Sequence, residues 1–202
     1  MARYRASSVA AQESPRAGAL WAEAEVSTDG GSLRHAMPTT RINTKRAPRR
    51  ELAFSCADCL RAELDRIGAA HARGTLRTSG NWTPGENLQH CAKLFECAMD
   101  GWPTTAPWVV RVLGTLIFKK RLTSGRTPPA GIPLGKDTAF LLPEPACSFD
   151  KGMAAMREVL ARLDGGKLMQ VPSPVFGKLS HDEWMRCCLG HAQLHLGFLW
   201  LE

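Results

Sequence analysis

The stretch SHDEWMRCCLGHAQLHLGFLWL, residues 180–201, indicates a helix that carries two histidines on its apolar face. It opens with Ser180 followed three residues later by Glu183, which is the pattern of a capping box. Apolar side chains then recur every three or four residues, at Trp184, Cys187, Cys188, Leu194, Phe198 and Leu201. His191 and His195 fall on this same stripe. We therefore expect a helix from residue 181 to about 201, with both imidazoles turned toward the protein core.

Working outward from this segment, three more stretches show the apolar spacing of helices: 51–74, 84–102 and 149–164. A further apolar segment at 108–120 ends in Lys-Lys-Arg, and cations suit a helix C-terminus. Residues 123–148 are rich in proline and are expected to form an extended connection. No strand alternation of useful length is visible. The fold class predicted is all-α, with a four-helix bundle as the default architecture.

The histidines suggest a metal site. His191 and His195 are four residues apart, so their side chains lie one above the other on a helix. His90 lies at the edge of the apolar face of the helix that begins after Thr83. A buried imidazole without a partner costs roughly 1–3 kcal/mol, and a shared divalent ion would remove that cost for all three. The alternative is that each is an ordinary core or boundary histidine with its own hydrogen bond.

Several motifs resemble the DinB/YfiT-like superfamily, and more narrowly a branch classed as a domain of unknown function. They are GNWTPGE (80–86) followed by His90, PVFGKLS (174–180) followed by Glu183-Trp184, and HAQLHL (191–196). The similarity covers about residues 37–201. It implies a DinB-like four-helix bundle of up-down-down-up connectivity. It also implies a metal held by His90, His191 and His195, which leaves a coordination position open, as in catalytic sites.

Members of the wider superfamily include transferases and isomerases that use a low-molecular-weight thiol such as bacillithiol or mycothiol. The resemblance thus favours a metal-dependent thiol S-transferase, or a hydrolase, acting on a small molecule. Imidazole ligands suit Zn or Ni best and also accept Fe or Mn. Two alternatives stay open: a non-catalytic binding module, and a nucleic-acid-associated stress protein. Broad apolar faces are also compatible with a homodimer.

The basic charge is concentrated near the N-terminus. The chain carries a formal charge of +7, and residues 1–50 contribute nine Lys/Arg against four Asp/Glu. This segment has no sustained apolar period, so we expect a disordered tail, with residues 1–36 outside the domain at 37–202. Met37 could be the native start. The remaining basic candidates for nucleic acid lack interleaved aromatic residues, which argues against that partner; they are Arg111, Lys119, Lys120, Arg121 and Arg126.

Seven cysteines form an odd set with no regular framework, and no export signal or membrane-spanning run is visible. A reducing cytoplasm is the expected location, with several thiols acting as small core residues. Cys187, one turn before His191, is a candidate for a fourth ligand or a reactive thiol, and it also fits the pattern of a small core residue. Cys56 and Cys59 are expected to lie inside a helix, which argues against a redox pair. Glu86 and His181 are the candidates for a general base. The capping box already accounts for Glu86, and His181 lies about ten residues before His191 on the same helix, too far for direct contact.

Overall fold

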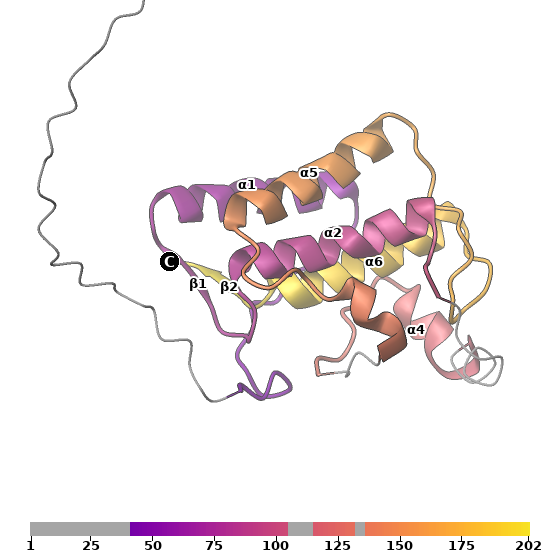
Figure 1. The fold of residues 1–202 in the computed structure, drawn as a ribbon, viewed down its shortest axis with the longest axis horizontal. Coiled ribbons are helices and arrows are strands. Elements are labelled where there is room, and N and C mark those ends of the chain that lie inside the picture. Colours follow the sequence, from indigo (N-terminus) through magenta and orange to yellow (C-terminus); the bar gives the residue numbers. More distant parts are fainter. Residues whose placement is uncertain (1–40, 105–114, 132–135) are drawn as a thin grey trace, which may run out of the picture. The chain divides into compact units, whose positions relative to one another are not determined.

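Four main helices pack together in the computed structural model, which describes residues 41–104, 115–131 and 136–202 (Figure 1). They are α1 (Ala57–Ala72), α2 (Pro84–Asp100), α5 (Phe149–Asp164) and α6 (His181–Leu196). Helices α1 and α2 each pack against both α5 and α6. The predicted all-α fold class is therefore confirmed, as are the two capping boxes that open α2 and α6.

Helices α2 and α5 run in the same direction and approach closely at their first turns. A Cβ placed on Gly85 would lie only 2.3 Å from the carbonyl oxygen of Ser148, so a side chain at this position would collide with the backbone of the neighbouring segment. At the opposite ends, Arg162 donates a hydrogen bond of 2.5 Å to Asp100. Gly85, the second glycine of the GNWTPGE motif, thus sets the spacing between two helices.

A two-stranded ribbon joins segments that are far apart in the sequence. Strand β1 (Leu76–Thr78) pairs antiparallel with β2 (Leu199–Leu201), with Leu76 opposite Leu201. Since β1 follows the end of α1 and β2 follows the end of α6, both helices end at the ribbon, where α2 begins. The bundle therefore has the up-down-down-up connectivity that the resemblance implied. Two expectations were wrong: the chain does contain strands, and the last helix ends at Leu196 rather than near Leu201.

The segment before α1 is extended and packed onto the bundle. The first helix begins at Ala57, not at residue 51, although Phe54 in the preceding stretch is already buried. Arg50 donates a 2.6 Å hydrogen bond to the buried carboxylate of Glu63 and another to the carbonyl oxygen of Leu196. The expectation of a tail reaching residue 50 is therefore wrong for residues 41–50, because Arg50 gains partners that only the folded bundle provides.

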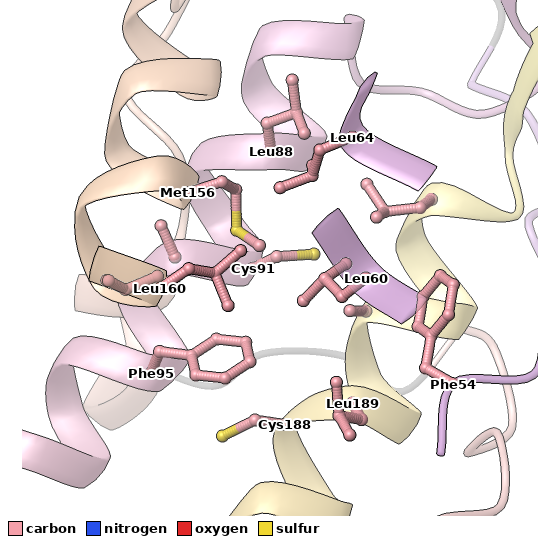
Figure 2. Close-up of a cluster of buried hydrophobic side chains, with 14 of the residues drawn as sticks. Phe54, Leu60, Leu64, Leu88, Cys91, Phe95, Met156, Leu160, Cys188 and Leu189 are labelled. Carbon is pink, nitrogen blue, oxygen red and sulfur yellow. The ribbon is translucent and has the colours of Figure 1, made fainter. Parts of the chain in front are cut away.

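The core lies between the four helices, and each of them contributes to it (Figure 2). Leu60 and Leu64 come from α1, Phe95 from α2, Met156 from α5 and Leu189 from α6, and all are at most 2% exposed. A leucine or phenylalanine buried to this extent stabilises the fold by roughly 1.5–3 kcal/mol. This apolar layer fixes the inward faces of α2 and α6, which also carry the histidines.

The described part of the connection between α2 and α5 contains three short helical pieces. They are a π-helical turn η1 (Thr115–Lys119), the short α4 (Lys120–Leu122) and a 3₁₀ helix η2 (Lys136–Leu141), and only the last of them lies within residues 123–148. The expectation that residues 123–148 are extended was therefore only partly right. Most of the apolar run predicted at 108–120 lies outside the described residues. Within the described ranges, none of the helices combines the length and apolar character needed to cross a membrane.

Candidate metal centre

His90, His191 and His195 meet between α2 and α6, as the sequence predicts. The ring centroids are 4.8 Å apart for His90 and His191, 4.4 Å for His90 and His195, and 4.5 Å for the two histidines of α6. One ring nitrogen from each residue can be chosen so that all three lie within 4.8 Å of one another. The Ser180–Glu183 capping box fixes the start of α6, and the four-residue spacing then stacks its two imidazoles on one face.

The hydrogen bonds around the three rings leave ligand atoms free. The Nδ1–H of His90 donates to the carbonyl oxygen of Leu141 at 2.6 Å, which leaves its Nε2 as the free acceptor. The Nε2 of His191 and the Nδ1 of His195 are buried and have no partner. In the described part of the chain only three buried side-chain nitrogen or oxygen atoms lack a partner, and two of them are here. Buried unpaired nitrogens on converging rings are what a metal ion would satisfy.

All three imidazoles are neutral at physiological pH. Burial lowers the pKa of His191 to about 3, helped by the proximity of His90. Burial is also the main reason that the pKa of His195 lies well below its ordinary value and that the pKa of His90 is lowered. A neutral imidazole has the lone pair that a metal needs, so proton competition for this site is weak at neutral pH.

Trp82 forms one wall of the site, although the sequence pattern did not predict it as a site residue. Its ring centroid lies 4.6 Å from that of His90 and 5.4 Å from that of His195, with which it is stacked. The carbonyl oxygen of Trp82 also accepts a hydrogen bond from the buried Asn87 side chain. Trp82 belongs to the GNWTPGE motif, so the sequence marks it as part of the family resemblance. The sequence does not indicate that its ring faces the histidines.

A cavity of about 660 Å³ opens beside the triad and reaches His195. Trp82 and the bundle supply its apolar wall, while Arg41 and Lys45 line it from the segment that precedes α1. Asn81 holds that segment in place with two hydrogen bonds to the backbone of Ile42, of 2.8 and 2.9 Å. No acidic side chain is among the described residues that line the cavity. The cavity is therefore electropositive and suited to an anionic small molecule.

The segment that carries Leu141 is attached to α2 by a series of side chains. The Lys93 ammonium donates to the carbonyl oxygen of Leu142, and the Gln89 side-chain oxygen accepts from the backbone N–H of Glu144, at 2.5 and 2.7 Å. These bonds keep the carbonyl oxygen of Leu141 in position to accept from His90. The second layer of the site therefore comes from the backbone, which sequence reasoning about histidines alone does not reveal.

The other candidates from the sequence have structural roles. Both carboxylate oxygens of Glu86 are engaged, one by the Thr83 N–H of the capping box and one by the Ala146 N–H. The Nδ1 of His181 accepts a hydrogen bond from the backbone N–H of Met169. Cys187 is not part of the metal-ligand cluster found among the described residues, and burial raises the pKa of its thiol to about 11.

The basic residues that suggested nucleic acid are spread over the connection between α2 and α5. The Lys119 ammonium donates to the backbone of Lys178, whereas Lys120, Arg121 and Arg126 are exposed. Arg111 lies outside the described residues. The electropositive cavity next to the histidines draws on Arg41 and Lys45, which belong to a different part of the sequence.

The fold and the site together define a helical-bundle protein with three converging histidines that could bind a metal. Residues 46–201 match the family described as "Protein of unknown function (DUF1569)", and the chain belongs to that family. No curated protein matches the chain. No solved structure matches it either.

Proposed function

We propose that the protein is a metal-dependent enzyme that activates a low-molecular-weight thiol for addition to a small electrophile, within a DinB-like bundle. The observation that carries this proposal is the pair of unpartnered buried nitrogens on His191 and His195, whose rings converge with that of His90 beside an accessible cavity. A core built only for stability would provide hydrogen bonds for such groups. A catalytic metal site instead needs three protein ligands and access for a fourth.

Each histidine would contribute one nitrogen to the ion, and the Leu141 carbonyl oxygen fixes which nitrogen His90 can offer. A divalent cation held there supplies a Lewis acid that lowers the pKa of a bound thiol or water. Zn or Ni fits the imidazole donors best, and Fe or Mn is compatible with them. Trp82 packs against His90 and His195 and covers one side of the triad. In the addition, the thiol would lose its proton to solvent and its sulfur would form a bond to the electrophilic carbon. The electron pair displaced from the π bond or strained ring of the electrophile would take up a proton from solvent.

The cavity supports a small substrate that carries negative charge. Its volume of about 660 Å³ lies within the usual range for small-molecule sites. The cations of Arg41 and Lys45 would attract carboxylate groups, such as those of glutathione and bacillithiol, while mycothiol offers none. We therefore propose that anionic thiols are preferred over neutral ones.

Metal analysis of the purified full-length protein tests the first part of the proposal. We expect about one equivalent of metal in the natural protein and a near-complete loss in His191→Ala/His195→Ala. The matched control is His71→Ala, since His71 is exposed, stacks on Phe149 and is not one of the three clustered histidines; it should retain the metal. Equal, near-zero metal in the natural protein and the double variant would overturn the proposal.

The reaction is tested with a panel of model electrophiles offered with glutathione, bacillithiol or mycothiol. We expect thiol-dependent turnover that the double histidine variant loses. Arg41→Gln/Lys45→Gln should raise the KM for the anionic thiols several-fold and leave the KM for mycothiol unchanged. Turnover that requires metal but no thiol would instead assign hydrolysis. Metal retention without turnover would assign a non-catalytic binding role.

A further inference from the structure

A second chemically distinctive feature lies at the start of α1, which contributes no histidine to the metal centre. Cys56 is the N-cap residue of this helix, with an extended backbone (φ −154°, ψ 170°), and Cys59 follows in its first turn. The expectation that both lie inside a helix is therefore wrong for Cys56 and confirmed for Cys59. Their sulfur atoms are 3.0 Å apart, and the Sγ of Cys59 is 3.4 Å from the Ser55 hydroxyl. A disulfide needs about 2.05 Å, so only a small side-chain movement separates this geometry from a bond.

The surroundings favour the thiolate of Cys59. Hydrogen bonds from the Ser55 hydroxyl and the Cys56 thiol lower the pKa of Cys59 to about 7. The first N–H groups of a helix have no partner within the helix and carry partial positive charge, which adds to this effect. Asp58 is the acidic residue of the same turn, and its carboxylate is paired with Arg61 at 2.6 Å.

The pair is also accessible, unlike most of the other thiols. Cys56 is exposed and Cys59 is partly exposed. Three of the remaining five cysteines are buried, namely Cys91, Cys147 and Cys188. Cys97 is partly buried, and burial together with Glu96 and Asp100 raises its pKa to about 11. Reactivity toward oxidants should therefore concentrate at the start of α1.

We propose that Cys56 and Cys59 form a redox-active dithiol that exchanges with low-molecular-weight disulfides. The Cys59 thiolate attacks one sulfur of the small disulfide, which forms a mixed disulfide and releases the first small thiol. The Cys56 thiol loses its proton and attacks the Sγ of Cys59, which forms the Cys56–Cys59 disulfide and releases the second. The dithiol is oxidised by two electrons and the small disulfide is reduced by two, so one disulfide is exchanged for another. This activity does not depend on the metal centre.

Peptide chemistry makes the proposal straightforward to test on the full-length protein. Trypsin releases residues 51–61, ELAFSCADCLR, which contain both Cys56 and Cys59 and no other cysteine. The protein is equilibrated with glutathione buffers of increasing oxidised fraction, and the remaining thiols are alkylated. The masses of the tryptic peptides are then measured by mass spectrometry. We expect both alkylation sites of this peptide to be lost together, while the peptide of residues 94–111, with Cys97 alone, remains alkylated.

Single variants separate the two roles. Cys56→Ser should accumulate one glutathione on Cys59, because the resolving thiol is missing, whereas Cys59→Ser should react slowly. The control Cys97→Ser should titrate like the natural protein. Cys59 should also react with iodoacetamide about a hundredfold faster than Cys97 at pH 7, after allowing for the lower nucleophilicity of a less basic thiolate. A peptide that stays doubly alkylated at every glutathione ratio, or a Cys56→Ser variant that captures no glutathione, would overturn the proposal.

Discussion

The unpartnered nitrogens of His191 and His195 predict an unusual response to apolar substitution. In the metal-free protein, His191→Leu/His195→Leu should raise the stability, because it removes two buried nitrogens that have no partner. Each such group costs about 1–3 kcal/mol, and each leucine costs up to about 1.5 kcal/mol in imperfect packing. We expect a net gain of about 2 kcal/mol, which corresponds to roughly 4–8 °C in Tm for a domain of this size.

The assay is thermal unfolding followed by circular dichroism, first after treatment with a chelator and then with added zinc. The double variant should melt above the chelator-treated natural protein and should not respond to zinc. The natural protein at about 100 times the zinc Kd should gain about 2.7 kcal/mol, or roughly 5–11 °C. These two results together would show that the two histidines destabilise the metal-free fold and that zinc binding stabilises it.

His181→Leu is the matched control, because it makes the same substitution on the same helix at a histidine that has a partner. His181 accepts a hydrogen bond of 3.1 Å from the backbone N–H of Met169, so its replacement should destabilise the protein by about 1 kcal/mol. If the double variant is also destabilised, and zinc leaves the melting of the natural protein unchanged, then the two imidazoles are ordinary core residues and the reasoning fails.

Two further predictions concern acid and helix spacing. Burial lowers the folded-state pKa of His191 to about 3, so the unfolded state takes up a proton first as the pH falls. The stability present above about pH 6.5 should therefore decrease below that pH, by up to about 1.4 kcal/mol per pH unit for each such histidine. Denaturant titrations of metal-free protein between pH 7.5 and 5 measure this, and an equal acid loss in the His191→Leu/His195→Leu variant would contradict it. Gly85→Ala should destabilise the fold by roughly 2–4 kcal/mol, since the new Cβ would lie 2.3 Å from the Ser148 carbonyl oxygen. The same change at Gly68, inside α1 with the nearest atom 4.0 Å from the new Cβ, should stabilise the fold by about 0.5–1 kcal/mol. Denaturant unfolding of both variants measures these changes, and a stabilised Gly85→Ala or a destabilised Gly68→Ala would contradict the reasoning.

Local patterns predicted the four main helices well, and the reasons are visible in the structure. The capping boxes at Thr83 and Ser180 form as expected, because both partners lie within three residues of each other in the chain. The helix at 149–164 was placed correctly by its apolar spacing and by the glycines that follow it. Such signals depend only on neighbours along the chain, and therefore can be read without knowing the fold.

The ends of α1 and α6 were predicted less well, because their limits depend on distant partners. Residues 199–201 continue the apolar stripe of the last helix, yet they form a strand because residues 76–78 offer free backbone groups beside them. The residues from 51 to 56 are apolar enough to continue α1, but the chain before Cys56 extends across the bundle and buries Phe54 instead. Cys56, which was expected inside a helix, is for this reason the N-cap residue of α1.

Apolar spacing along the chain was enough to predict which side chains would face the core, and therefore that His90, His191 and His195 would lie on inward surfaces. Only the tertiary structure decided that the three rings meet, that the Leu141 carbonyl oxygen orients His90, and that two ring nitrogens are left without partners. The physical reason is that helix periodicity fixes the direction of a side chain around its own axis, whereas contacts between α2 and α6 depend on how whole helices pack. The electropositive cavity follows the same rule, because Arg41 and Lys45 reach it only after residues 41–50 fold onto the bundle.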